Sequence, residues 1–271
     1  MLGEMLRNLR KNAPRLHCIT NYVTANDCAN LLLACGAHPI MADDPDEAAE
    51  IVSACTGLVL NLGVPNPRKL EAMRIAGSKA NECGIPVVLD PVGVGASHMR
   101  MQAVQRLLQE VKIDAIRGNS AEIAALSSGT CNAAGVDALT AVVENDRQNW
   151  TMAKNLASKI GAIVVLTGKR DIVTDGKIVY CVDNGCEAMR LVTGTGCMLT
   201  CLMGAFLAAN QGEKLMAALA AVCAMGVCGE RASEQGNGRL GNASMRANIL
   251  DTMCGLTERD LEREARYAII G

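Results

Sequence analysis

The chain has 271 residues, of which 50% are hydrophobic and 20% are charged, and its formal net charge is −2. This length can bury one large hydrophobic core, and the composition is that of an ordinary folded protein. A weakly negative chain has no electrostatic reason to bind nucleic acid or an anionic membrane surface. Aromatic residues make up only 2% of the chain, which also argues against a surface for stacking bases. We therefore expect neither a nucleic-acid partner nor a membrane partner.

Thirteen cysteines could form a disulfide framework, but their context favours free thiols. Several, including Cys35, Cys201 and Cys223, lie inside apolar runs, where cysteine behaves as a small buried hydrophobic residue. No pair or cluster has the spacing of a zinc site. The first sixteen residues carry charges throughout and lack the apolar stretch of a signal peptide. We expect a reducing, cytoplasmic location.

Strand-like and helix-like segments alternate along the first half of the chain. A strand over Leu16–Thr20 precedes a helix that begins near Thr24, whose side chain can cap it, and ends at Gly36. An acidic loop at Asp43–Asp46 precedes the next helix. The further predicted elements are an apolar run at His38–Met41, helices over Glu47–Ala54, Arg68–Cys83 and Met99–Val111, and strands at Leu58–Leu62, Pro86–Leu89 and Ile113–Ile116.

The second half continues the pattern. A helix through Leu126 is followed by a loose segment, Ser127–Asp146, rich in small and polar residues. Asp171–Thr174 and Ile178–Val182 read as a hairpin closed by Asp175-Gly176. The remaining predictions are a helix at Asn149–Ile160, a strand at Ala162–Leu166, a loop at Gly236–Gly241, and helices near Ala243–Met253 and Thr257–Ala265.

This alternation predicts an α/β fold with a mostly parallel sheet covered by helices on both faces. No internal repeat or linker interrupts it, so we expect residues 1–271 to form one domain. In such sheets, ligands bind at the carboxyl ends of the strands.

Two segments, Leu191–Gly212 and Leu215–Gly229, carry no charge, and the first is long enough to span a membrane. However, it opens with a glycine turn, and only Glu213-Lys214 separates it from the second. We interpret both as buried helices packed through small residues.

The most informative stretch is VTGTGCMLTCLMG, from Val192 to Gly204. The glycines of Gly194-Thr195-Gly196 allow a sharp turn and a close approach to a ligand. The helix that follows presents free N–H groups and a positive dipole end, which together favour an anion such as a phosphoryl group. Cys197 lies in the first turn, where we expect the same field to favour its thiolate.

Polar residues follow the other predicted strands at their carboxyl ends. They are Asn21, Asp90, Arg117, Glu122 and Thr167. Carboxylates are suitable ligands for magnesium, and arginine offers a rigid fork to phosphate oxygens. With the glycine turn as an anion cradle, these are the parts that phosphoryl transfer needs.

Each residue also has a simpler explanation. Asp90 can merely end a strand, Glu122 is favoured in the first turn of any helix, and Arg117 can be a surface cation. Cys197 can be one more buried thiol, and Met41 an ordinary core residue. The functional interpretation depends on all of them meeting at one edge of the sheet.

Seven motifs, in order along the chain, resemble those of the hydroxyethylthiazole kinases of thiamine biosynthesis. The combination of LDPVGVGA, RGN-x-x-E and VTGTGC is specific, whereas no single piece is. The motifs are CITNYVT (Cys18–Thr24), PIMAD (Pro39–Asp43), NLG (Asn61–Gly63), LDPVGVGAS (Leu89–Ser97), IRGNSAEI (Ile116–Ile123), LTG (Leu166–Gly168) and VTGTGCM (Val192–Met198).

This resemblance implies a ribokinase-like, three-layer α/β fold without a separate lid. It implies ATP-dependent phosphorylation of the hydroxyl of 4-methyl-5-(2-hydroxyethyl)thiazole. By motif, Met41 and Gly194 would contact the thiazole, and Asn21 would help to position it. The family is usually a homotrimer with substrate bound between subunits, which implies the same assembly here.

The resemblance also assigns the nucleotide side of the site. Arg117 and Thr167 would contact ATP, and Asp90 and Glu122 would hold magnesium directly or through water. Cys197 occupies the place where related sugar and pyrimidine kinases carry an aspartate base.

Three other functions remain open from the sequence. A ribokinase-like lyase that dehydrates hydrated nicotinamide nucleotides would share the fold and the cradle but would carry an acid in place of Cys197. The cysteine also argues against a hydroxymethylpyrimidine kinase. A non-catalytic nucleotide-sensing module would not need Asp90 and Glu122.

Overall fold

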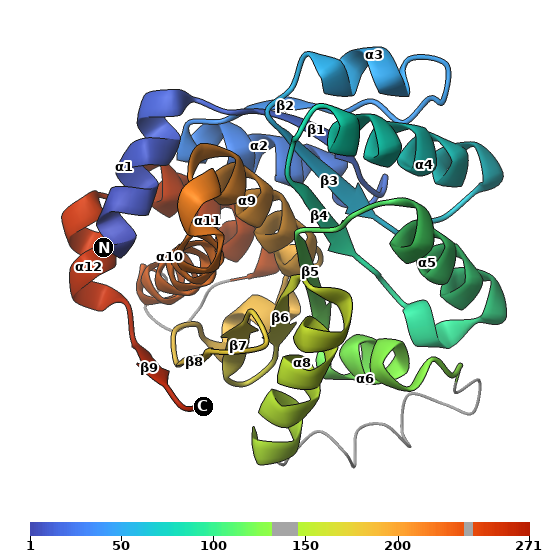
Figure 1. Ribbon diagram of the computed structural model, residues 1–271. Coiled ribbons are helices and arrows are strands. Elements are labelled where there is room, and N and C mark those ends of the chain that lie inside the picture. Colours follow the sequence, from blue (N-terminus) through green and yellow to red (C-terminus); the bar gives the residue numbers. More distant parts are fainter. Residues whose placement is uncertain (132–145, 236–240) are drawn as a thin grey trace.

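A computed structural model describes residues 1–131, 146–235 and 241–271 (Figure 1). Within these residues nine strands form one sheet in the order β2-β1-β3-β4-β5-β6-β7-β8-β9. The strands from β2 to β6 in this order pair in parallel, and the pairs from β6 to β9 are antiparallel. The strands are β1 Arg15–Ile19, β2 His38–Ile40, β3 Gly57–Asn61, β4 Val87–Asp90, β5 Ala115–Asn119, β6 Ile163–Thr167, β7 Asp171–Thr174, β8 Val179–Val182 and β9 Tyr267–Ile269.

Two helical layers cover the sheet, as Figure 1 shows. One layer contains α3 Ala48–Ser53, α4 Pro67–Glu82, α5 His98–Glu110, α6 Ser120–Ser128 and α8 Asp146–Ile160. The other contains α1 Leu2–Asn12, α2 Ala25–Cys35, α9 Thr195–Ala209, α10 Lys214–Glu234, α11 Asn242–Gly255 and α12 Glu258–Glu264. Short 3-10 turns, η1 Val94–Ala96, η2 Glu187–Leu191 and η3 Gln211–Glu213, complete the described elements. The predicted three-layer α/β architecture is confirmed.

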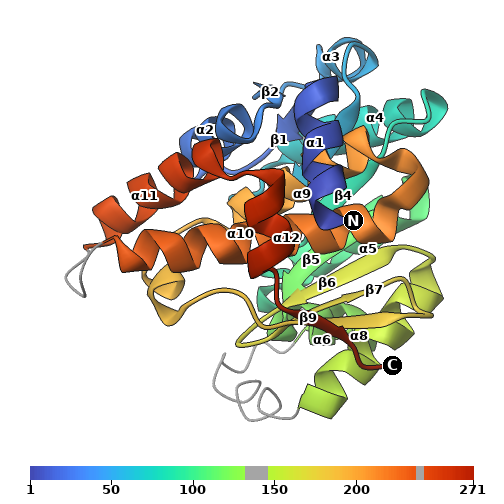
Figure 2. The same cartoon turned by 90° about the vertical axis from the view of Figure 1, so that its left-hand side faces the viewer.

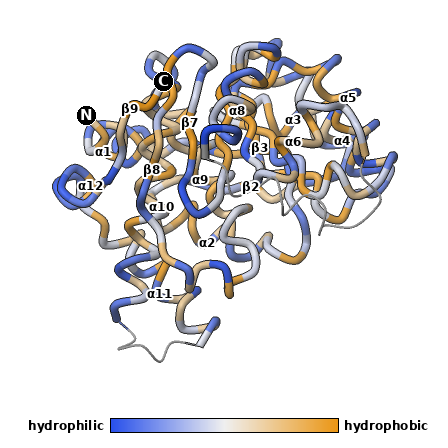
Figure 3. The backbone as a smooth tube through the Cα atoms, turned by 90° about the horizontal axis from the view of Figure 1, so that it is seen from below, coloured by the Kyte–Doolittle hydropathy of each residue, from blue (hydrophilic) through white to orange (hydrophobic). Residues whose placement is uncertain are grey.

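The central strands are buried on both faces. Every residue of β3 and β4 is buried, as expected for parallel strands between two helical layers. The outer helix α12 is by contrast hydrophilic over most of its length (Figure 3), and Leu261 is its buried residue. The hydrophobic pattern therefore separates the core strands from the surface helices.

The two uncharged segments fold as the core helices α9 and α10. By length and composition, Gln211–Glu234 could cross a membrane, but 78% of its apolar window is buried inside the protein. It packs along α11 (Figure 2) and against α9 and α1. The apolar character of α10 is thus explained by its place in the core.

Several local predictions need correction. The carboxyl end of β5 extends to Asn119, because Arg117 to Asn119 continue the ladder with Val165 to Thr167 of β6. Thr24 stands at the N-cap of α2, but its hydroxyl donates to Asn21 Oδ1 and makes no capping bond. The sequence did not lead us to expect α1 or β9. The predicted loose segment Ser127–Asp146 and the loop Gly236–Gly241 lie mostly outside the described residues.

Helix α9 lies unusually close to the sheet because two of its contact positions are glycines. A methyl group added at Gly204 would be 2.6 Å from Val59 Cγ2 and 3.3 Å from Leu16 Cδ1. A methyl group at Gly57 of β3 would be 2.6 Å from Leu16 Cδ1 and 3.1 Å from Ala208 Cβ on α9. This close packing sets the depth at which the first turn of α9 meets the strand ends.

We predict that Gly204→Val lowers the free energy of unfolding by about 1–3 kcal/mol, because the added atoms overpack a rigid core. Gly212→Val is the matched control, because the space around Gly212 is open. Urea unfolding followed by circular dichroism measures both. Equal stability of the two variants would contradict the close-packing account.

Candidate active site

The side chains at the ends of β1, β3 and β4 meet the first turn of α9, and Asn61 connects them. Its Oδ1 accepts from Asn21 Nδ2 at 3.1 Å, and its Nδ2 donates to Asp90 Oδ2 at 3.1 Å. The same Nδ2 lies 3.3 Å from Cys197 Sγ, and Asn21 Nδ2 lies 3.4 Å from that sulfur. Asn61 is not among the site residues predicted from the sequence. Its signal was a polar side chain at the end of an otherwise apolar strand.

Asp90 is fully buried at the end of β4. Its Oδ2 accepts from Thr200 Oγ1 of α9 at 2.8 Å and lies 3.7 Å from Arg117 Nη1. Its Oδ1 is buried with no hydrogen-bond partner among the described residues. Burial raises the pKa of Asp90, Arg117 opposes this rise, and the charge of Glu122 adds to it. Asp90 thus keeps one oxygen available in a site of concentrated charge.

Arg117 lies across the start of α9. Its Nη2 donates to Thr167 Oγ1 at 2.5 Å. A methyl group added at Gly196 would clash with both Nη atoms of this guanidinium. The absence of a side chain at Gly196 is therefore what lets Arg117 lie against the helix. The structure thus brings Arg117, Thr167 and the predicted cradle together.

The turn that opens α9 requires glycine for two reasons. Gly194 is the N-cap with φ +93°, a left-handed conformation that favours glycine. A methyl group there would also lie 2.5 Å from Thr24 Cγ2. As at the start of any helix, the N–H groups of Thr195, Gly196 and Cys197 have no acceptor within the helix. The local positive field makes this turn suitable for an anion.

Glu122 connects the loop that follows β4 with the carboxyl end of β5. Its Oε2 accepts from the backbone N–H of Asn119 at 2.8 Å, and Asn119 Oδ1 accepts from the N–H of Glu122 at 2.9 Å. Its Oε1 accepts from the backbone N–H of Gly93 at 2.9 Å. The capping role that we weighed as the simpler explanation is therefore present. It does not exclude a second role, because each carboxylate oxygen has a further lone pair.

The expected thiolate character of Cys197 is wrong. Burial raises the pKa of the thiol, and the nearby charge of Asp90 raises it further. Hydrogen bonds from Thr24 and Asn61 favour the anion but do not reverse the shift. Desolvation thus exceeds the favourable field of the helix start. Cys197 is a protonated thiol at neutral pH.

Met41 lies at the same edge of the sheet, just beyond β2, and is 39% exposed. Tyr22, Val23 and Val64 are also exposed large side chains, and they follow β1 and β3. The ends of three adjacent strands thus carry exposed large side chains beside the polar cluster.

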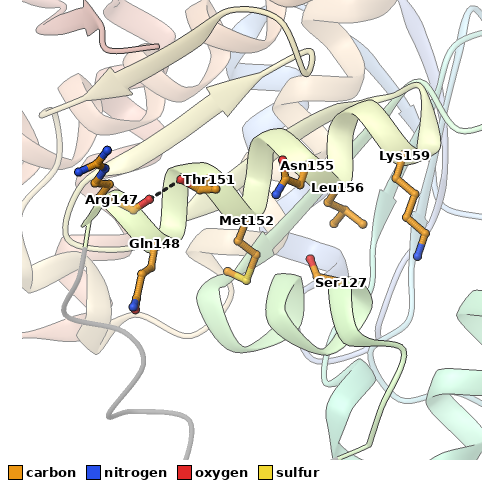
Figure 4. A pocket seen from close by; sticks show the side chains of 8 residues that line it. All are labelled: Ser127, Arg147, Gln148, Thr151, Met152, Asn155, Leu156 and Lys159. Carbon is orange, nitrogen blue, oxygen red and sulfur yellow. Dashed lines mark hydrogen bonds between the residues drawn. The ribbon is translucent and has the colours of Figure 1, made fainter.

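A separate groove of about 730 Å³ lies between the end of α6 and α8 (Figure 4). None of its lining side chains follows a strand, and none was predicted as a site residue. They are Ser127, Arg147, Gln148, Thr151, Met152, Asn155, Leu156 and Lys159. The predicted site residues lie elsewhere, at the carboxyl ends of the strands and the start of α9.

Comparison with known proteins decides the family. The model of the hydroxyethylthiazole kinase family matches residues 6–259. A hydroxyethylthiazole kinase of Clostridium acetobutylicum is 47% identical over 270 residues, which cover 98% of this chain and 99% of the relative. The chain belongs to the hydroxyethylthiazole kinase family.

Solved structures agree with this assignment. A hydroxyethylthiazole kinase from Pyrococcus horikoshii OT3 superposes with a TM-score of 0.89 at 32% identity, covering 100% of this chain and 99% of that one. A ribokinase-like superfamily protein from Enterococcus faecalis has a TM-score of 0.63 at 13% identity, covering 94% and 89% of the two chains, and this similarity bears on the fold alone. The ribokinase-like fold is confirmed.

The carboxylates of this kinase fit a magnesium ion that arrives with a nucleotide. Asp90 offers an unpartnered buried oxygen, and Glu122 lies near enough to influence its pKa. Within the described residues no group of three or more His, Cys, Asp or Glu side chains could hold a metal. Magnesium usually takes one or two protein carboxylates and completes its shell with phosphates and water, which this donor set matches.

We predict that Gly196→Val lowers kcat/KM at least about a hundredfold while the protein stays folded, because the side chain displaces Arg117 and blocks the helix start. Gly241→Val is the control, since a methyl group added at Gly241 would have no atom of the described residues beyond its chain neighbours within 4 Å. Steady-state kinetics gives kcat/KM for both variants, and thermal unfolding shows whether each is folded. Unchanged kinetics of Gly196→Val would refute the cradle.

Proposed function

We propose that this protein transfers the γ-phosphoryl group of ATP to the hydroxyl of 4-methyl-5-(2-hydroxyethyl)thiazole, in thiamine salvage or biosynthesis. One observation supports this most strongly. In a chain of the hydroxyethylthiazole kinase family, the glycine turn that opens α9 lies against both Arg117 and the strand end that carries Asp90. The transferring group would then lie between backbone N–H donors and a fixed cation.

On the nucleotide side, Arg117 and Thr167 bind ATP. The guanidinium is already oriented by its bond to Thr167 Oγ1, so little side-chain freedom is lost on binding. The N–H groups of Thr195, Gly196 and Cys197 receive the charge that spreads over the transferring phosphoryl group. Because these donors are fixed by the fold, they need no reorganisation during the reaction.

Asp90 and Glu122 would hold a magnesium ion, directly or through water. When bound with ATP, magnesium supplies positive charge to the phosphate oxygens. The unpartnered Oδ1 of Asp90 is the atom best placed for a direct bond. Thr200 and Asn61 keep that carboxylate in place by donating to its other oxygen.

On the acceptor side, Met41 and Gly194 contact the thiazole and Asn21 orients it. Cys197 lies beside Asn21 and orients or accepts the hydroxyl proton. Phosphoryl transfer through a loose transition state asks little of a base, so a protonated thiol is compatible with turnover. Positioning therefore contributes more here than proton removal.

We propose that the chain works as one domain in a cytoplasmic homotrimer with the substrate bound between subunits. The nine described strands form one sheet, which supports a single domain. The exposed side chains of Tyr22, Val23, Met41 and Val64 surround the acceptor side and suit burial against a second copy. Sedimentation equilibrium measures the mass of the assembly, and a monomer would contradict the trimer.

The function is tested by ADP release from ATP in the presence of the thiazole alcohol. We expect release that requires both the alcohol and magnesium, with loss of turnover when the metal is chelated. Hydrated nicotinamide nucleotide serves as the competing substrate in a parallel assay. No turnover of the alcohol by the folded protein would reject the proposed reaction.

We predict that Cys197→Asp retains turnover within about tenfold of the wild type, because a carboxylate can take the same proton. The amides of Asn21 and Asn61 already point at this position and would hydrogen-bond a carboxylate. The measurement is kcat by ADP release, with circular dichroism as the folding control. Complete inactivity of a folded variant would remove the assigned role.

A further inference from the structure

Lys69, the third residue of α4, is buried with only 1% of its surface exposed. Its Nζ donates to the backbone carbonyl of Gly63 at 2.6 Å. Within the described part of the chain it forms no ion pair. Burying an ammonium group with so little compensation is costly. A methionine or leucine would fill the same volume without this cost, so the lysine calls for an explanation.

Through Gly63, Lys69 is connected by hydrogen bonds to Asn61 in the candidate active site. The backbone N–H of Gly63 donates to Asn61 Oδ1 at 2.9 Å. The amide nitrogen of Asn61 in turn donates to Asp90 Oδ2 and points at Cys197 Sγ. Lys69 thus binds the carbonyl group of Gly63, and Asn61 binds its N–H group. A shift of Gly63 would rotate the amide that orients both Asp90 and Cys197.

The loop that contains Gly63 needs such a restraint. The next residue, Val64, has φ +48°, which is strained for a β-branched side chain. Asn66 closes the loop by accepting from the backbone N–H of Lys69 at 2.9 Å. Gly63 also packs tightly, since a methyl group there would lie 2.8 Å from Asn21 Cβ. Lys69 therefore anchors a strained loop at the point where it touches Asn21, a predicted site residue, and Asn61.

The titratable groups around Lys69 lie on three other elements. Burial lowers its pKa to about 8, Asp43 beyond β2 and Cys197 of α9 oppose this, and Arg100 of α5 lowers it further. At neutral pH the side chain is thus protonated and a strong donor. Its bond to Gly63, which packs against Asn21, places the ammonium on the proposed acceptor side of the site.

We propose that Lys69 is a positioning residue for phosphoryl transfer: through Gly63 it sets the amide of Asn61, which holds Asp90 and Cys197 in their working geometry. The proposal rests on the proposed kinase function. Lys69 touches no reacting atom and neither of the side chains assigned to ATP, Arg117 and Thr167, so its removal should lower the rate of transfer far more than the affinity for ATP.

The test compares Lys69→Met, which keeps an unbranched chain up to the ε position and removes the ammonium group, with Lys79→Met on the exposed face of the same helix. We expect Lys69→Met to lower kcat roughly tenfold to a hundredfold, the effect of a small misplacement, while KM for ATP changes less than about twofold. Lys79→Met should match the wild type. Melting temperatures establish that both variants are folded.

A double-mutant cycle with Asn61→Ala tests whether Lys69 acts through Asn61. If it does, adding Lys69→Met to Asn61→Ala lowers kcat by less than about threefold, because the two residues form one unit. Fully multiplicative losses would overturn the proposal. So would wild-type kinetics of Lys69→Met, or a loss explained by its unfolded fraction.

If Lys69→Met does not fold, Lys69→Gln is used instead. Glutamine is polar, but its side chain is one bond shorter than that of lysine. The same loss of kcat is expected, with KM for ATP changed less than about twofold. Wild-type kinetics of this variant would equally overturn the proposal. Inactivity of the wild type toward the thiazole alcohol would instead reject the kinase function. The two failures are therefore distinguishable.

Discussion

The hydrogen bond from Thr200 to Asp90 ties the first part of α9 to the end of β4, and the active site depends on it. Without it, the glycine turn would be the start of an ordinary core helix. With it, the turn is held beside a buried carboxylate and against Arg117. Because α9 is buried in the core almost throughout, the rigidity of that core is passed directly to the anion cradle.

The site concentrates buried polar groups whose individual burial is costly. Among the described residues, Asp90 is fully buried, Arg117 Nε has no hydrogen-bond partner, and Lys69 Nζ bonds to one carbonyl. An apolar core would be more stable, so these groups are explained by function more readily than by folding. In the proposed function, ATP phosphates and the cations that accompany them would supply the charges that such a site lacks.

The protonation state of Cys197 depends on which is larger, the effect of the helix start or the effect of burial. A helix start favours a thiolate, but this effect is modest and falls off within one turn. Burial and the charge of Asp90 act on the same sulfur and raise the pKa of the thiol. The resulting neutral thiol, held by two amides, is better suited to orienting a hydroxyl than to deprotonating it.

The sequence predicted the layers of the fold because buried strands and amphipathic helices differ in length and periodicity. It also placed Asp90 and Arg117 at strand ends and the glycine turn at a helix start, since local patterns mark where an element begins or stops. The hairpin after β6 was predicted from its turn residues alone.

Only the tertiary structure decided which of these residues touch. The importance of Asn61 comes from a contact across 136 positions of the chain to Cys197. That of Lys69 comes from its burial, because an ordinary helical lysine would be exposed. The protonation of Cys197 was likewise set by burial, which a single helix start does not reveal. Local sequence determines elements and their ends, whereas burial and long-range hydrogen bonds depend on how those elements pack.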